Sequence, residues 1–100
     1  MRPRALDEIH DARRYTTTAA TLIAGDDIFD GHNYERSGRN CFLYRTPRGR
    51  FFLAHQTTIA DERDHIEPLD RDAAIVAFER LAARRVEWAE AFPGLTIEEA

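Results

Sequence analysis

Residues 40–56 carry the clearest pattern in the chain, two runs of β-favouring aromatic and aliphatic residues on either side of a short arginine-bearing segment. This pattern predicts two β-strands joined by a tight turn at Thr46-Pro-Arg-Gly49. Pro47 presets the backbone φ angle for such a turn, and Gly49 can take the left-handed conformation that other residues enter at a cost. The segment therefore predicts a hairpin together with its register.

The register follows from placing Thr46 opposite Arg50, which pairs Arg45 with Phe51 and Cys41 with His55. Because side chains alternate along a strand, the hairpin has two distinct faces. One face carries Phe42, Tyr44, Phe52 and Ala54, and the other carries Cys41, Leu43, Arg45, Phe51, Leu53 and His55. Both faces are substantially apolar, so the sheet needs two covers. We expect a helix on one face, and a partner, a second copy of the chain or the N-terminal segment on the other.

Apolar residues recur at helical spacing in residues 71–85, which predicts the helix that covers the sheet. Asp70 is the expected N-cap, and Asp72 complements the positive end of the helix dipole. The expected buried stripe consists of Ala74, Ile75, Phe78, Leu81 and Ala82. Residues 86–92 predict a further short helix that Pro93-Gly94 ends.

The remaining segments have less regular patterns. Residues 1–14 are highly charged and predict either a frayed end or a short helix. The threonine-rich residues 16–24 predict a strand in their second half, with a threonine-capped helix as the alternative. Residues 26–39 have no period and predict a long connection, the kind of segment in which partners often bind. Residues 57–66 predict a polar linker.

These elements predict a single domain over residues 1–100 with an α+β fold. We expect a small antiparallel sheet of about three strands, centred on the hairpin 40–56 and covered on one face by the C-terminal helix 71–85. A chain of this length has room for one core and buries only about two-thirds of its unfolded surface. Its stability is expected to be modest, and homodimerisation would add to it.

The charge is unevenly distributed. The composition is 43% apolar and 32% charged, and the net charge is −4, which argues against a general binder of nucleic acid or membrane surfaces. Residues 1–50, however, hold nine arginines against seven acidic residues, a net of +2, whereas residues 51–100 hold five against eleven, a net of −6. All positive residues are arginine, the better bidentate partner for carboxylate and phosphate. A locally basic patch is therefore compatible with the acidic total.

The single cysteine, Cys41, excludes an internal disulfide and a zinc site built from several cysteines, and it fits a reducing cytoplasm. The N-terminus lacks the apolar core of a signal peptide, and no apolar run approaches the length of a membrane span. We expect a cytoplasmic protein that does not contact membranes.

Candidate chemistry is sparse. The histidines His10, His32, His55 and His65 have neither helical nor close loop spacing, so we expect no metal site, and the predicted Cys41–His55 pair is interpreted as a plain cross-strand contact. The carboxylates lie in polar runs, and the chain has no phosphate loop or nucleophile elbow. We expect no cofactor and no catalytic residues, that is, a protein that is not an enzyme.

The candidate partner-binding residues are the arginines around the hairpin, with one aromatic neighbour. They are Arg36, Arg39, Arg45, Arg48, Arg50 and Phe51. A β-ribbon with a basic tip can meet an acidic protein surface or lie along a phosphate backbone, where aromatic rings can stack on bases. The same arginines could also pair with the acidic half of the chain, within one molecule or across a dimer.

Three segments together resemble a family of small, largely uncharacterised bacterial proteins that phages and other mobile elements often carry. These segments are Arg14-Tyr-Thr-x-Thr-Ala19, Leu43-Tyr-Arg-Thr-Pro-Arg-Gly-Arg-Phe-Phe-Leu53 and Ile66-Glu-Pro-Leu-Asp-Arg-Asp-Ala-Ala74. The resemblance implies no catalytic residues and suggests a protein that binds a host complex, as anti-CRISPR proteins do. We therefore expect a non-catalytic module that binds a host protein or protein complex, such as a bacterial defence complex. A regulator that binds nucleic acid through the basic hairpin is the alternative.

Overall fold

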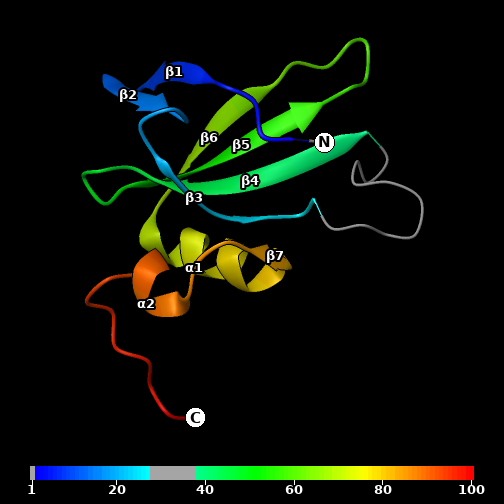
Figure 1. Ribbon diagram of the computed structural model, residues 1–100. Coiled ribbons are helices and arrows are strands. Elements are labelled where there is room, and N and C mark those ends of the chain that lie inside the picture. Colours follow the sequence, from blue (N-terminus) through cyan, green and yellow to red (C-terminus); the bar gives the residue numbers. More distant parts are fainter. Residues whose placement is uncertain (1, 28–37) are drawn as a thin grey trace.

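The computed structural model describes residues 2–27 and 38–100, which form short strands and helices (Figure 1). In chain order the elements are β1 (Asp7–His10), β2 (Arg13–Thr16), β3 (Thr21–Gly25), β4 (Arg39–Arg45), β5 (Phe51–Thr57), β6 (His65–Leu69), α1 (Arg71–Arg80), β7 (Ala83–Arg84) and α2 (Trp88–Ala91).

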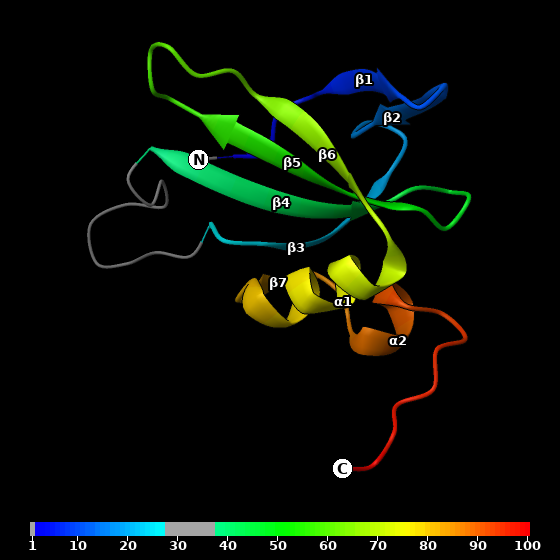
Figure 2. The same ribbon diagram turned by 180° about the vertical axis from the view of Figure 1, so that it is seen from behind.

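The strands make two antiparallel sheets. β1 and β2 form a two-stranded hairpin, and the other strands form a five-stranded sheet in the order β6-β5-β4-β3-β7. Both helices lie on one side of the larger sheet, and the β1–β2 hairpin lies on the other side (Figures 1 and 2). The sheet is thus the middle of three layers.

The predicted three-stranded sheet covered by a long C-terminal helix is wrong. The described chain is mostly sheet, because β6 and β7 extend the larger sheet and β1–β2 forms a second one. β6 has little sequence signal because it is an edge strand in which only Ile66 is buried, and Pro68 is tolerated at an edge that needs no further N–H donor.

The predicted helix over residues 71–85 is too long. Asp70 caps α1 as expected, since its Oδ1 accepts a hydrogen bond of 2.8 Å from the Ala73 N–H. The helix ends at Arg80 because Leu81 is extended, and Ala83–Arg84 then pair with β3 as β7. In the part of the chain that the structure describes, no helix is long and apolar enough to cross a membrane.

The N-terminal residues are neither frayed nor helical. β1 and β2 are joined by Asp11 and Ala12, whose φ angles are 53° and 59°. Two successive left-handed residues define the type I′ turn that matches the twist of a two-residue hairpin. Asparagine and glycine usually occupy these positions, so Asp11-Ala12 gives little sequence signal for the turn.

The central hairpin has the predicted register. β4 and β5 pair from Arg39 opposite Thr57 to Arg45 opposite Phe51, and Cys41 faces His55. Gly49 has a φ of 83°, and the Gly49 N–H donates to the Thr46 carbonyl over 2.9 Å. The prediction of a strand in the second half of residues 16–24 is also confirmed, since it forms β3.

Each face of the sheet has its own core. On the helix side, Leu43, Phe51 and Leu53 pack with Ala74, Ala77, Phe78 and Leu81. On the other side, Phe42, Tyr44, Phe52, Ala54 and Ile66 pack with Tyr15 from β2. The Tyr15 ring meets Phe52 edge-on with ring centroids 5.7 Å apart. The sequence left three candidates for the second cover, namely a partner, a second copy of the chain and the N-terminal segment. The N-terminal segment is the one that covers this face.

Hydrogen bonds fix this N-terminal cover to the sheet. The buried Gln56 of β5 accepts from the Arg4 N–H at 2.7 Å and donates to the Arg2 carbonyl at 2.9 Å. Thr17 accepts from the Leu6 N–H through its hydroxyl at 2.9 Å. Because the chain covers both faces itself, an uncovered apolar face no longer argues for a partner.

Candidate anion-binding groove

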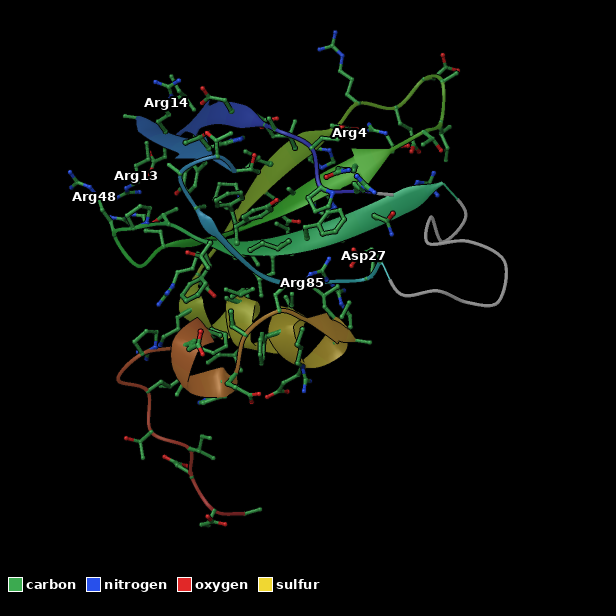
Figure 3. All side chains as sticks on the ribbon, in the orientation of Figure 1. Arg4, Arg13, Arg14, Asp27, Arg48 and Arg85 are labelled. Atoms are coloured by element: carbon green, nitrogen blue, oxygen red, sulfur yellow. The ribbon has the colours of Figure 1, made fainter. Side chains whose placement is uncertain are left out.

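A groove of about 450 Å³ lies between the β1–β2 turn and the β4–β5 turn. Four arginines line it, namely Arg13, Arg14, Arg48 and Arg50. Its walls also include the apolar atoms of Ala12, Tyr15, Ala19 and Pro47. Figure 3 shows Arg13, Arg14 and Arg48 at the same end of the molecule. Guanidinium groups gathered around a partly apolar groove favour an anionic ligand with some apolar surface.

The local structure of both turns places these arginines. Arg13 and Arg14 follow the left-handed pair Asp11-Ala12 and begin β2, and the buried Tyr15 anchors this strand in the core. Arg48 lies in the β4–β5 turn, and the Arg50 N–H donates to the Thr46 hydroxyl at 3.0 Å. The groove is therefore held by two hydrogen-bonded hairpins rather than by side chains alone.

Carboxylates of the N-terminal hairpin neutralise part of this charge. Arg14 forms an ion pair with Asp7, and Arg13 lies 3.3 Å from the Asp11 carboxylate. The hydrogen bond from Arg14 lowers the pKa of Asp7 below its usual value, and the same contact raises the pKa of Arg14. Arg48 and Arg50 form no ion pair with any residue in 2–27 or 38–100. Among the four arginines of the groove, these two are the ones without a carboxylate partner in the described part of the chain.

The groove contains two of the six predicted partner-binding residues, Arg48 and Arg50. Arg39 begins β4 at the far end of the hairpin, where it forms an ion pair with Glu62. Arg45 ends β4 opposite Phe51, and Phe51 is only 6% exposed because it packs in the helix-side core. Arg36 lies outside the described residues.

Sequence reasoning missed Arg13 and Arg14 as site residues. They are more than thirty positions from Arg48, and only the packing of the N-terminal hairpin on the sheet brings the two turns together. An arginine pair directly before a β-favouring tyrosine is the signal in the sequence that could have found them.

A second cavity, of about 520 Å³, lies at the other end of β4 and β5 and contains the Cys41–His55 pair. The Cys41 Sγ lies 3.8 Å from His55 Nδ1, and His55 Nε2 lies 2.8 Å from a Glu67 carboxylate oxygen. This row has the order of a nucleophile, a base and an orienting acid. Burial, reinforced by the charge of Asp26, nevertheless raises the pKa of Cys41 to about 12, which disfavours the thiolate that a nucleophile needs.

The described side chains around this cavity are not grouped in the way that metal ligands are. Across residues 2–27 and 38–100, no group of three or more histidine, cysteine or acidic side chains is arranged to hold one. We therefore interpret the Cys41–His55–Glu67 row as a structural contact across three neighbouring strands.

A third cavity, of about 550 Å³, lies beside the helices and includes Trp88. Its arginines already have partners: Arg84 donates to the carbonyls of Phe78 and Glu79, and Arg85 forms an ion pair with Asp27. The groove between the two turns is thus the better candidate for an external charged ligand.

No protein-family model, curated protein or solved structure that was compared with the chain matches it.

Proposed function

We propose that the protein is a small non-catalytic binding module that holds an acidic segment of a partner protein in the groove between its two turns. The single observation that carries this proposal is the pair Arg48 and Arg50, which line a hairpin-bounded groove and have no carboxylate partner among the described residues. Each guanidinium group can bind a carboxylate through two parallel hydrogen bonds in a fixed geometry.

The groove walls support a peptide as the ligand. Ala19, Pro47 and Tyr15 place apolar atoms beside the guanidinium groups. An extended acidic peptide alternates its side chains, so it can direct carboxylates to the arginines and an aliphatic side chain to these walls.

The overall charge favours an acidic protein segment over nucleic acid. The net charge of the chain is −4, the sum of −6 in residues 51–100 and +2 in residues 1–50. A nucleic-acid strand extends its charge far beyond a single groove, so the net negative charge of the chain opposes its binding more than that of a short acidic segment. A short acidic segment contacts the basic groove alone.

The resemblance to proteins of mobile elements supports a host protein complex, such as a bacterial defence complex, as the source of this segment. That part of the proposal rests on the resemblance, whereas the chemistry of the ligand rests on the groove.

Fluorescence anisotropy can test the proposal with two probes, a labelled peptide of glutamate and leucine and a labelled oligothymidylate. We expect the peptide to bind, and the variant Arg48→Ala/Arg50→Ala to weaken its binding by about tenfold or more, which corresponds to about 1.4 kcal/mol. The matched control is Arg63→Ala/Arg71→Ala, which removes the same charge from exposed positions outside the groove and should bind the peptide like the wild type.

Two outcomes would contradict the proposal. Equal peptide binding by both double variants would show that the groove is not the site. Tighter binding of the oligothymidylate, lost in Arg48→Ala/Arg50→Ala and falling steeply between about 50 and 200 mM salt, would identify nucleic acid as the ligand instead.

A further inference from the structure

The chain itself carries an acidic extended segment in residues 96–100. Leu95 is the last residue that the core holds, since it packs on the helix-side core and its N–H donates to the Phe92 carbonyl at 3.2 Å. The residues after it are exposed and form neither helix nor strand. Figures 1 and 2 show this segment leading away from the body of the molecule.

The chemistry of this segment complements the groove. Glu98 and Glu99 are exposed and form no ion pair within residues 2–27 and 38–100. Arg48 and Arg50 of the groove likewise have no ion-pair partner among these residues. Ile97 is 64% exposed and presents an aliphatic side chain beside the two carboxylates. The segment therefore offers two carboxylates and one aliphatic side chain to a groove with two available guanidinium groups and apolar walls.

We infer that residues 96–100 of a second copy of the chain occupy the groove, so that two copies exchange these segments in a symmetric dimer. The inference rests on the proposed function, because it places in the same groove a segment with the same acidic chemistry as the partner segment proposed above. In a symmetric exchange each copy fills one groove and supplies one segment, which leaves neither groove empty and closes the assembly at two chains.

The layers of the fold favour a second copy over the same chain. The segment leaves from the helix layer, whereas the β1–β2 turn that forms half of the groove belongs to the layer on the other side of the sheet. In both ribbon views the segment leads away from that layer. Exchange between copies also adds a stabilising contact to a small domain with modest burial.

Sedimentation over a range of protein concentrations tests the inference. We expect the wild type to form dimers as the concentration rises. Arg48→Glu/Arg50→Glu and Glu98→Arg/Glu99→Arg should each raise the dimer dissociation constant by tenfold or more, because each puts like charges together in the contact. The matched control is Asp61→Arg/Glu79→Arg, which changes two other exposed acidic residues and should dimerise like the wild type.

A mixture of the two charge-reversed variants gives the decisive result. The basic segment of one variant then faces the acidic groove of the other, and the remaining wild-type segment faces the remaining wild-type groove. We expect the equimolar mixture to regain the dimer, whereas variants that fail to fold would not regain it. Circular dichroism of each variant alone confirms that it is folded before mixing.

The inference is overturned if the wild type sediments as a monomer at every concentration, or if the dimer survives both charge reversals. It is also overturned if the exchange of amide hydrogens in residues 96–100 is slowed to the same degree at all concentrations, which would place the segment in the groove of its own chain. Failure of the proposed function is separate. In that case the labelled acidic peptide does not bind the folded Glu98→Arg/Glu99→Arg variant, whose groove is intact and whose own segment no longer competes.

Discussion

Arg85 and Asp27 form a two-pronged ion pair that ties the segment after β7 to the chain just beyond β3 (Figure 3). The Arg85 Nη1 lies 2.9 Å from Asp27 Oδ1, and the Asp27 side chain is only 13% exposed. Burial alone would raise the pKa of Asp27, but the hydrogen bond and charge of Arg85 outweigh it and hold the pKa below its usual value. This contact fixes the edge of the sheet where β7 contributes only two residues.

Replacing Arg85 with alanine should lower the free energy of unfolding by about 1 kcal/mol at neutral pH, the upper range for a partly exposed pair. The lowered pKa of Asp27 means that its contribution is present above the unfolded pKa of about 3.9 and is lost as the pH falls through the lower folded pKa. The difference between wild type and Arg85→Ala should therefore shrink in acid. Urea denaturation at neutral pH and below about pH 4 measures it.

Arg71→Ala is the control for this pair, because Arg71 is exposed at the start of α1 and forms no ion pair with a described residue. Its stability should lie within about 0.5 kcal/mol of the wild type. If the free energy of unfolding of Arg85→Ala lies below that of the wild type by the same amount at every pH, the loss comes from packing and not from the ion pair.

Tyr15 should be the residue that makes the N-terminal hairpin part of the core. It is 5% exposed and contacts Phe52 on the face opposite the helices. Tyr15→Ala should cost about 3 kcal/mol and expose this apolar face, which a fluorescent hydrophobic dye would report. Ile9→Ala, on the neighbouring strand but 72% exposed, is the matched control and should change little. Equal effects of the two substitutions would contradict the three-layer arrangement.

Replacing Gly49 or Gly25 with alanine should destabilise the fold, for a different reason at each position. At Gly49 a Cβ atom would meet nothing within 4 Å, but the φ of 83° costs an L-residue about 1–2 kcal/mol. Gly49→Asn should cost less, since asparagine tolerates this conformation. At Gly25 a Cβ atom would lie 2.8 Å from the fully buried Phe42 ring, so the core itself must shift. The thermal unfolding midpoints of Gly49→Ala, Gly49→Asn and Gly25→Ala measure these costs.

The two glycine variants should both lose stability but differ in how they bind the acidic peptide. Gly49→Ala strains the turn that carries Arg48, so the folded variant should bind the acidic peptide more weakly than the wild type. Gly25 lies away from the groove, so folded Gly25→Ala should bind it normally. Unchanged peptide binding in Gly49→Ala would show that the turn geometry does not position the arginine.

The sequence specifies those elements that depend on local chemistry. The turn at Gly49 fixes the pairing of seven residues on each strand, and Asp70 caps the helix that it precedes. Both depend on neighbours within a few positions, so the sequence pattern was sufficient. β6 depends on its pairing with β5, and its single buried residue, Ile66, leaves no alternating pattern to detect.

Contacts between distant segments explain the remaining errors. The groove joins Arg13 and Arg14 to Arg48 only because Tyr15 packs on the sheet, and no local pattern encodes that contact. The end of α1 likewise depends on β3, which offers Ala83–Arg84 a pairing partner in place of further helix. For the same reason the sequence left open which of three covers takes the second apolar face, since the charged N-terminus gives no sign that it forms that cover.

Cys41 should react slowly in the folded protein. Its pKa of about 12 leaves on the order of 10³-fold less thiolate at pH 8 than an unperturbed thiol with a pKa of about 8.5. We therefore expect a disulfide reagent to label the native protein far more slowly than the protein unfolded in urea. His55→Ala gives the sharper test. If the Cys41–His55–Glu67 row activated the thiol, this substitution would slow labelling further, whereas a structural contact predicts labelling that is unchanged or faster, because the cavity then opens towards Cys41.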